Sequence, residues 1–291
     1  MKCSLCPRRC NAERDKHLNL NGYCKMPLQP VVARADLHFW EEPVISGKNG
    51  SGTVFFSGCA LRCVYCQNFE ISHLCKGKEI SVNRLAEIFK ELEKTGAHNI
   101  NLVNPTHFAV AIKQALDIYK PKIPIVYNSG GYDSPEILKM LEKYIDIFLL
   151  DFKYMSPDRA KKYSYASDYP RVAMETIKEC CRIVPETVIE NGIMKKGIII
   201  RHLLLPRATN EAIEIFEWVR KNVPNGYFSL MSQYMPYALA DKFPEINRPV
   251  TKREYEKVVD FICGTDFENV FIQSRSSSNE KYIPEFNFRG V

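Results

Sequence analysis

The most informative residues of the chain are three cysteines, Cys59, Cys63 and Cys66, at the spacing C-x3-C-x2-C. Cysteine thiolates are the usual ligands of iron–sulfur clusters, and three of them on one loop can hold three irons of a 4Fe-4S cluster. The fourth iron then lacks a protein ligand and can bind a chelating cofactor. Gly58 lets the backbone turn sharply into this loop, and Tyr65 offers an aromatic face beside it. The alternatives are buried structural cysteines or a zinc loop, although structural zinc sites use four ligands.

Four more cysteines, Cys3, Cys6, Cys10 and Cys24, form a second group with the spacing C-x2-C-x3-C-x13-C. Four thiolates suit a zinc ion or an auxiliary iron–sulfur cluster, and the spacing does not decide between them. The alternative is a set of redox-inert surface thiols. The number of closely spaced ligands predicts a second metal site. The remaining cysteines are interpreted as structural: Cys75, Cys180, Cys181 and Cys263.

The elements that must position these groups alternate between strand and helix from residue 53 onward. Apolar runs predict strands, and apolar residues at helical spacing predict helices. The predicted strands are 53–57, 99–103, 123–127, 145–152, 197–205, 227–231 and 270–273. The predicted helices are 82–93, 108–119, one that opens at Ser134-Pro135-Glu136, 169–184, 210–221 and 252–262. This alternation, repeated about six times, predicts parallel strands with right-handed crossovers.

The positions of the polar residues favour a barrel over an open doubly wound sheet. No G-x-G-x-x-G follows the first predicted strand, which weakens the case for a dinucleotide-binding fold. Polar residues instead follow the carboxyl ends of nearly every strand, and several strands that feed one site are typical of a barrel. These residues are Cys59, Asn104, Asn128, Asp151, Lys153, Arg201 and Gln233.

The net charge and the distribution of apolar residues bear on which classes of function the chain can have. The chain has 291 residues and a net charge of +6 that is not concentrated in any run, so nothing requires nucleic acid or a membrane surface. No apolar run approaches the roughly 20 residues that a membrane helix needs. No signal peptide precedes the clustered cysteines, which predicts a cytoplasmic metal protein rather than a disulfide-bonded one. We expect a Cys-rich extension over 1–52 and a barrel over 53–291.

The segment from Gly58 to Asn68 resembles the signature C-x3-C-x-aromatic-C of the radical S-adenosylmethionine (SAM) superfamily. The region 53–273 is similar to the pyruvate formate-lyase activating enzymes, and more so to their uncharacterised iron–sulfur relatives. The resemblance implies an α/β fold, a partial (β/α)6 barrel, with a 4Fe-4S cluster that cleaves SAM reductively to a 5′-deoxyadenosyl radical for hydrogen abstraction. The residues that carry it are 58–68, 104–107, 127–132, 150–153, 200–202 and 232–236.

The resemblance also suggests which strand-end residues meet SAM. Asp151 and Lys153 flank one residue of a strand and point to the same side, so they are expected to contact SAM, with an ordinary charge pair as the alternative. Arg201 is expected at the SAM carboxylate, or in a salt bridge to Asp151. Asn104 stands where the activating enzymes carry a Gly-Gly-Glu-like stretch. It is expected to meet the SAM amino group, although Asn also suits turns.

Two further residues complete the expected cofactor site. Asn128 lies at a strand end equivalent to that of Asn104, and it too is either a SAM contact or a turn former. Gln233 is expected to face adenosine or substrate. No catalytic side chain is assigned.

The leading hypothesis for function is an activase that installs a glycyl radical on a partner protein, with a flavodoxin- or ferredoxin-type electron donor. The second is a radical SAM enzyme that acts on a small molecule or another polypeptide. The third is a non-catalytic iron–sulfur electron carrier or interaction protein. The third predicts no SAM-binding groups at the strand ends, whereas the sequence contains several. The first two share every motif and differ only in the substrate.

Overall fold

The computed structural model describes residues 2–14, 22–274 and 284–291. Its strands are β1 (Val31–His38), β2 (Ser51–Phe56), β3 (Lys78–Glu79), β4 (Ile100–Val103), β5 (Ile125–Ser129), β6 (Ile147–Asp151), β7 (Val188–Glu190), β8 (Ile193–Leu203), β9 (Tyr227–Met231) and β10 (Val270–Ile272). Its α-helices are α1 (Pro43–Ser46), α2 (Phe69–Ser72), α3 (Val82–Lys94), α4 (Ala109–Ile118), α5 (Pro135–Leu141), α6 (Pro157–Ser164), α7 (Tyr169–Ile183), α8 (Thr209–Asn222) and α9 (Lys252–Cys263). Two short 3-10 helices are η1 (Thr106–Phe108) and η2 (Ala240–Lys242).

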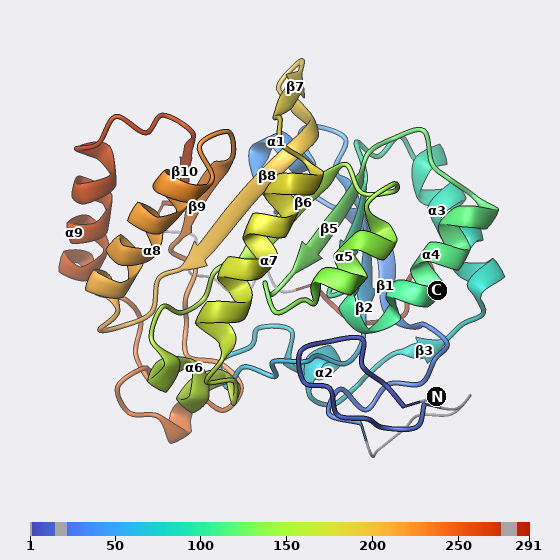
Figure 1. The fold of residues 1–291 in the computed structure, drawn as a ribbon, viewed down its shortest axis with the longest axis horizontal. Coiled ribbons are helices and arrows are strands. Elements are labelled where there is room, and N and C mark those ends of the chain that lie inside the picture. The colour runs from blue at the N-terminus through green and yellow to red at the C-terminus, as the bar shows by residue number, and fades with distance from the viewer. Residues whose placement is uncertain (1, 15–21, 275–283) are drawn as a thin grey trace.

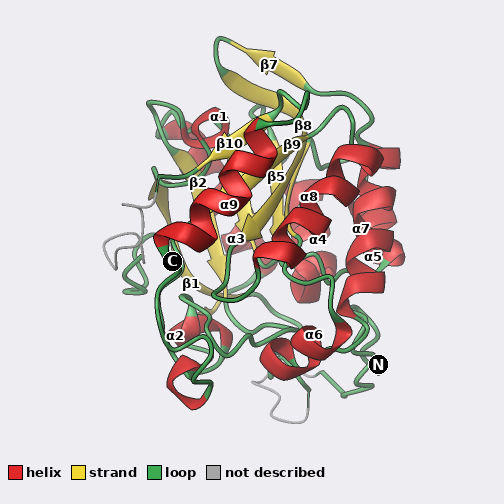
Figure 2. Cartoon of the chain, turned by 90° about the vertical axis from the view of Figure 1, so that its left-hand side faces the viewer, coloured by secondary structure: helices red, strands yellow, loops and turns green. Residues whose placement is uncertain are grey.

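One sheet forms the centre of the molecule, and its strands run parallel in the order β2-β4-β5-β6-β8-β9-β10. Helices α3, α4, α5, α7, α8 and α9 link successive members of this series (Figure 1). Figure 2 shows α4, α5, α7 and α8 grouped on one side of the strands. Within the described residues the sheet ends at β10 and β3 and does not close. These six strand–helix units confirm the predicted partial barrel.

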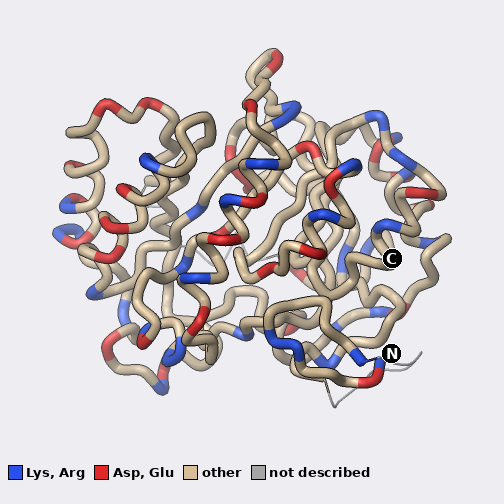
Figure 3. The backbone as a smooth tube through the Cα atoms, in the orientation of Figure 1, with Lys and Arg blue, Asp and Glu red and all other residues tan. Residues whose placement is uncertain are grey.

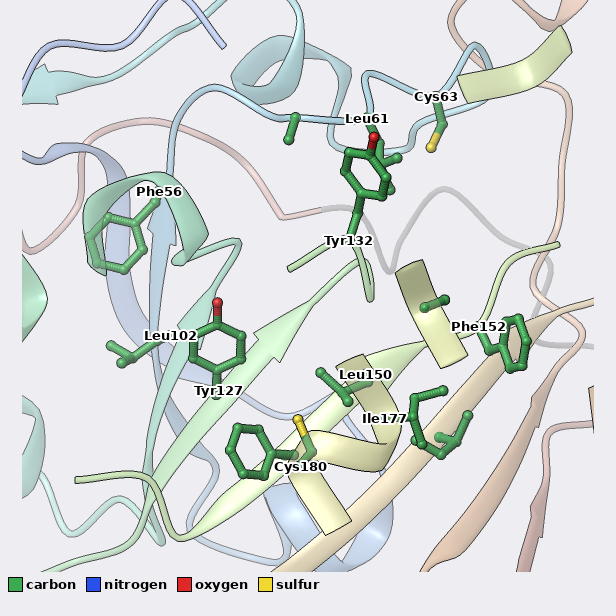
Figure 4. Packing of buried hydrophobic residues seen from close by; sticks show 14 of the residues in the cluster. Phe56, Leu61, Cys63, Leu102, Tyr127, Tyr132, Leu150, Phe152, Ile177 and Cys180 are labelled. Atoms are coloured by element: carbon green, nitrogen blue, oxygen red, sulfur yellow. The ribbon is translucent and has the colours of Figure 1, made fainter. Parts of the chain in front are cut away.

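Consecutive side chains of a strand point to opposite faces of the sheet, because the strand repeat is two residues. In β6, Phe148 and Leu150 pack in the main apolar core among the helices. Ile147 and Leu149 pack in a separate cluster on the other, inner face. Asp151 continues that inner row at the carboxyl end of the strand. Figure 4 shows members of the main core from several elements: Phe56, Leu102, Tyr127, Leu150 and Ile177.

The segment before the first parallel strand contains a strand that the sequence analysis did not predict. β1 pairs antiparallel with β2, with Asp36 opposite Thr53 and Leu37 opposite Gly52. β2 itself begins at Ser51, so the expected division of the chain at residue 52 falls inside a strand. One sheet therefore joins residues on both sides of that division, and two separate units stay a prediction.

Local signals explain where some helices begin. Thr251 and Glu254 form a capping box at the start of α9, which satisfies backbone N–H groups that have no partner in the first turn. At α5 the predicted N-cap residue Ser134 makes no capping hydrogen bond and instead donates to the carbonyl of Leu5 at 3.3 Å.

None of the helices in the described ranges is long and apolar enough to cross a membrane.

The carboxyl ends of the parallel strands all face one end of the molecule, which is the lower end in Figure 1. The N-terminal segment lies at this same end, near α2 and β3. Because parallel strands present their loops together at that end, it is the place where residues distant in sequence can form one site.

Candidate functional site

Residues 57–68, here called the cluster loop, leave the carboxyl end of β2. Gly58 has φ +78°, a backbone conformation that L side chains rarely adopt. A side chain at this position would also collide with Met26 and come within 2.7 Å of the carbonyl oxygen of Cys24. The sequence analysis expected Gly58 to permit a turn. The structure adds that the N-terminal segment packs directly on the cluster loop at this glycine.

The cluster loop brings Cys59, Cys63 and Cys66 to one side of a cavity of about 250 Å³. Each sulfur accepts a hydrogen bond. The backbone N–H of Leu61 lies 3.3 Å from the Cys59 sulfur. Ser164 Oγ lies 3.0 Å from the Cys63 sulfur and Ser72 Oγ 3.3 Å from the Cys66 sulfur. Hydrogen bonds to ligand sulfurs are one of the means by which proteins tune iron–sulfur clusters.

The three thiols of the cluster loop are side chains of the type that iron–sulfur clusters use as ligands. Across residues 2–14, 22–274 and 284–291, no three His, Cys, Asp or Glu side chains converge closely enough to hold one metal ion. A 4Fe-4S cluster places each thiolate on a different iron, so its ligand sulfurs stand further apart. Burial raises the pKa of Cys66 to about 12, an effect that negative charge on Cys63 increases. Binding iron as thiolates would therefore displace protons from buried sulfurs.

Tyr65 lines the cavity, and its hydroxyl group also takes part in a hydrogen bond within the buried core. Its hydroxyl is 2.6 Å from that of Tyr154, whose oxygen is 2.8 Å from Ser164 Oγ. Its ring makes edge-on contact with Tyr234 at a centroid distance of 5.9 Å. A buried chain of hydroxyl groups thus runs from Tyr65 to the serine that contacts the Cys63 sulfur. Figure 4 shows the loop segment of Leu61 and Cys63 beyond the ends of the strands.

Asp151 and Lys153 face the same cavity from the end of β6. Lys153 Nζ lies 2.6 Å from Asp151 Oδ2, which confirms that the two side chains point to the same side. Burial would raise the pKa of Asp151, but Arg201 and Lys153 outweigh burial and lower it. Burial would lower the pKa of Lys153, but Asp151 and negative charge on Cys63 raise it. Both groups are therefore charged at neutral pH, and the ammonium lies near the thiols.

Arg201 lies opposite Asp151 in the register of β6 and β8, and all three of its guanidinium nitrogens have partners. Nε donates to Asp151 at 2.8 Å, and Nη2 donates to Asn128 Oδ1 at 2.7 Å. Nη1 donates to Glu41 Oε2 at 2.9 Å. The salt bridge to Asp151, one of the two readings of Arg201, is thus present. We call Glu41, Asn128, Asp151, Lys153 and Arg201 the inner network.

Glu41 is the member of the inner network that sequence reasoning missed. It follows β1, and its other oxygen accepts hydrogen bonds from Asn101 at 3.0 Å and Asn128 at 3.2 Å. The adjacent Glu42 is buried and has an oxygen without a partner among the described residues. Burial raises the pKa of Glu42. A lone Glu-Glu pair before Pro43 carries no sequence signal for a site, because only the fold of β1 brings it to the barrel interior.

Asn104 and Asn128 lie at neighbouring strand ends and line the cavity. Asn104 has φ +62°, so it also forms the turn that ends β4. Its amide nitrogen donates to the carbonyl of Gly58, and its backbone N–H donates to Asn128 O at 2.7 Å. Asn104 therefore ties the cluster loop to the sheet, whatever else its amide oxygen contacts.

Gln233 lines the cavity after β9. Its carbonyl oxygen accepts a hydrogen bond from Gln67 Nε2 at 3.2 Å, and its side-chain nitrogen lies 3.9 Å from the sulfur of Met231. Gln67 directly follows Cys66, so this contact connects the far end of the cluster loop to the opposite side of the barrel. The other cavity walls are largely apolar: Phe55, Leu61, Ile71, Val103, Leu203 and Met231.

The two histidines at strand ends are structural. His107 Nε2 contacts the carbonyl of Ser57 at 2.6 Å, and His202 Nδ1 contacts the carbonyl of Phe152 at 2.7 Å. Burial lowers the pKa of His107 to about 3 and that of His202 to about 4. Both rings are therefore neutral at physiological pH.

The structure places the four N-terminal cysteines beside the cluster loop but outside the cavity. Cys6 and Cys24 are buried, Cys3 is half-buried and Cys10 is exposed. All are free thiols, as are the other cysteines of the chain. The structure does not test which metal they hold.

Comparisons with known proteins agree with this geometry. A family model described as the radical SAM superfamily matches residues 53–219. An uncharacterized protein of Methanocaldococcus jannaschii is 30% identical over 267 residues, which cover 89% of this chain and 73% of that protein. A pyruvate formate-lyase-activating enzyme of Streptococcus mutans is 27% identical over 192 residues, 58% of this chain and 66% of the enzyme.

Solved structures with a similar fold share little sequence. SuiB of Streptococcus suis, solved bound to S-adenosylmethionine, has a TM-score of 0.53 and 16% identity, and the match covers 74% of this chain and 48% of SuiB. Methylornithine synthase (PylB) has a TM-score of 0.51 and 13% identity, over 82% of this chain and 72% of the synthase. The chain thus spans about half the length of SuiB.

Proposed function

Because the chain belongs to the radical SAM superfamily, we propose that Cys59, Cys63 and Cys66 hold a 4Fe-4S cluster and that the adjoining cavity holds SAM. When bound, cluster and SAM supply the reductive cleavage of SAM to methionine and a 5′-deoxyadenosyl radical that abstracts a hydrogen atom. The protein itself binds, orients and shields these groups.

The observation that supports this proposal is that three thiols and a charged inner network line one cavity. An electron-carrying iron–sulfur protein needs only the thiols. A buried ammonium beside them, paired with Asp151, which Arg201 also binds, has no role in electron transfer alone and suits a zwitterionic ligand. The desolvation of such charges is costly, which favours a function in binding over one in stability.

We assign the SAM contacts to cavity groups whose hydrogen-bond donors or acceptors are not all used by partners within the protein. Lys153 offers its ammonium to the SAM carboxylate, because it lines the same cavity as the thiols and keeps donors beyond its bond to Asp151. The amide oxygen of Asn104 accepts from the SAM amino group. Arg201 acts as a positioning residue, because all of its nitrogens are engaged within the inner network. Asn128 and Gln233 complete the polar lining.

The substrate proposed is a protein, and the reaction is the formation of a glycyl radical on it. The support is the similarity to a pyruvate formate-lyase-activating enzyme over 58% of this chain. A flavodoxin- or ferredoxin-type protein supplies the electron. The second candidate reaction is the modification of another polypeptide or of a small molecule. The apolar part of the cavity beyond the inner network would accommodate a substrate of either kind.

The test is anaerobic reconstitution with iron and sulfide, followed by dithionite and SAM. We expect 5′-deoxyadenosine from the wild-type protein and from a control with the exposed Cys263→Ala, and none from Cys63→Ala. A cluster-replete wild-type protein that releases no 5′-deoxyadenosine would contradict the proposal. Incubation with candidate glycyl-radical proteins should then give a protein-centred radical signal by EPR. Release of 5′-deoxyadenosine without that signal for any candidate would favour the second substrate class.

A further inference from the structure

Two of the cluster-loop sulfurs lie beside serine hydroxyls, but those hydroxyls have neighbours of opposite chemistry. Ser164 Oγ lies 3.0 Å from the Cys63 sulfur, and Ser72 Oγ lies 3.3 Å from the Cys66 sulfur. Each hydroxyl carries one proton, so it can donate only one strong hydrogen bond. Which group receives that proton depends on the second partner of each serine.

The second partner of Ser164 is a hydroxyl group that can itself donate. Tyr154 Oη lies 2.8 Å from Ser164 Oγ, and Tyr65 Oη lies 2.6 Å from Tyr154 Oη. A hydrogen bond donated by Tyr154 leaves the Ser164 proton for the sulfur, and hydrogen bonds that run in one direction strengthen one another. This chain of hydroxyls therefore reinforces the hydrogen bond to Cys63.

The second partner of Ser72 is a ring nitrogen. His73 Nδ1 lies 2.9 Å from Ser72 Oγ, and Nε2 of the same ring lies 3.0 Å from the carbonyl oxygen of Arg62. A carbonyl oxygen only accepts, so Nε2 must carry a hydrogen. In a neutral imidazole the other nitrogen then has a lone pair and no hydrogen. Nδ1 therefore accepts the hydroxyl proton for which the Cys66 sulfur also competes.

The surroundings of His73 keep its ring fixed and neutral. The residue is buried, and its ring stacks on that of Phe69 with the centroids 4.5 Å apart and the planes at 24°. Burial and the charges of Arg62 and Lys25 lower the pKa of His73 to about 4. Figure 3 shows Lys and Arg positions around the N-terminal segment, at the end of the molecule where α2 lies. A second proton on the ring is therefore disfavoured at neutral pH.

The single turn of helix α2 holds the serine and the histidine in place. Ser72 is its last residue and His73 caps it. The backbone N–H of Ser72 donates to Asn68 O at 2.9 Å, and that of His73 donates to Phe69 O at 2.9 Å. Asn68 lies two positions after Cys66, so this turn continues directly from the last ligand of the cluster loop.

From this geometry we propose that His73 is a positioning residue for the cluster: it holds the Ser72 hydroxyl toward its own Nδ1 and so weakens the hydrogen bond that the Cys66 sulfur receives. The inference rests on the proposed function, because it takes Cys66 to be a cluster ligand. A hydrogen bond to a ligand sulfur favours the reduced, more negative cluster. Weakening that bond lowers the reduction potential, which makes the reduced cluster a stronger electron donor to SAM.

An EPR-monitored redox titration of the reconstituted full chain tests the proposal. His73→Phe keeps an aromatic ring against Phe69 and removes the competing acceptor, so the Ser72 hydroxyl turns to the sulfur. If the equilibrium constant for that hydrogen bond is tenfold larger in the reduced state, the potential rises by about 60 mV. His98→Phe is the matched control, because His98 Nε2 accepts a hydrogen bond from Asn49 N, and it should leave the potential unchanged. An unchanged or lower potential in His73→Phe overturns the proposal.

A serine variant separates this effect from a general disturbance of the cluster loop. Ser72→Ala should change the potential little in the wild-type chain, where the hydroxyl serves His73. The same change should abolish the rise in the His73→Phe chain. Such a double-mutant cycle isolates the coupling between the two side chains. A rise that persists in Ser72→Ala/His73→Phe overturns the proposal, because it would not act through the hydroxyl.

The iron-free protein gives a readout that does not depend on the cluster. Nitrogen NMR of labelled histidine at neutral pH should show His73 with hydrogen on Nε2 and an unprotonated Nδ1 that accepts a hydrogen bond. Ser72→Ala should shift the Nδ1 resonance toward that of a free imine nitrogen. Hydrogen on Nδ1 in the wild type, or no shift in Ser72→Ala, overturns the proposal even where His73→Phe fails to fold. A wild type that shows this NMR pattern but binds no cluster would instead count against the proposed function.

Discussion

The hydroxyl oxygen of Ser164 lies 3.0 Å from the sulfur of Cys63, although 101 positions separate the two residues in the chain. Ser164 ends α6, and the barrel returns this helix to the cluster loop. Its oxygen also contacts the hydroxyl of Tyr154 at 2.8 Å. The contact therefore connects the cluster loop to a fixed part of the scaffold.

Removal of this hydroxyl should lower the reduction potential of the cluster. A hydrogen bond to a ligand sulfur favours the reduced, more negative cluster. If the equilibrium constant for forming this hydrogen bond is tenfold larger in the reduced state, Ser164→Ala should shift the reduction potential by about −60 mV. An EPR-monitored redox titration measures this. Ser81→Ala, which removes an N-cap hydroxyl of α3, is the control and should leave the potential unchanged; an equal shift in both variants would rule the explanation out.

Loss of Lys153 should weaken SAM binding. A hydrogen bond to a charged group is worth about 1.5–3 kcal/mol, so Lys153→Met should raise the dissociation constant of SAM about 10- to 100-fold. Equilibrium dialysis with labelled SAM on the oxidised, reconstituted protein measures it. Lys162→Met, a half-exposed lysine paired with Glu245, is the matched control. Unchanged affinity in Lys153→Met would remove this residue from the site.

Arg201→Met should destabilise the fold strongly. It would leave Asp151, Glu41 and Asn128 without their shared donor, and breaking a buried charge network costs about 3–5 kcal/mol. Arg171→Met, which breaks an exposed pair with Glu175, should cost far less, because water and salt screen exposed ion pairs. Urea unfolding of the iron-free proteins measures both. Similar losses in the two variants would mean that the inner network is not energetically coupled.

Stability should fall as the pH falls below about 6.5. The folded protein lowers the pKa of His107 to about 3 and that of His202 to about 4, whereas unfolded histidine titrates near 6.5. Between these values the unfolded chain binds more protons, so the free energy of unfolding rises with pH. Each histidine contributes at most about 1.4 kcal/mol per pH unit.

His107→Gln, which keeps a donor for the carbonyl of Ser57, should flatten this dependence between pH 6 and 4.5. Urea unfolding of the iron-free protein at several pH values measures the slope. The control is His98→Gln, because His98 is the least buried of the histidines whose pKa the fold lowers. A slope in His107→Gln equal to that of the wild type would contradict the assignment.

Much of the barrel was predictable because its strands carry strong local signals. The strand at 227–231 was predicted at its observed bounds, and the helix at 252–262 differs from α9 by one residue. The strand-end residues Asp151 and Arg201 were predictable as neighbours because parallel strands bring their carboxyl ends together.

The remainder depends on contacts that no local pattern contains. β1 went unnoticed because it is an edge-side strand of mixed polar and apolar residues before a run of turns. Glu41 reaches Arg201 only because β1 pairs with β2, and 160 positions separate the two residues. Tyr65 was expected to present its aromatic face beside the cysteine loop, and it does line the cavity, but no local pattern predicts that its hydroxyl meets that of Tyr154.

The guanidinium of Arg8 donates to Ser164 O at 2.9 Å as well as to the cluster loop. The ribosome therefore completes the N-terminal thiols long before it makes the residues that hold them in place. Until Ser164 has left the exit tunnel, this segment cannot take its final position. The contact from Ser164 Oγ to the Cys63 thiol can likewise form only after more than half of the chain has been made.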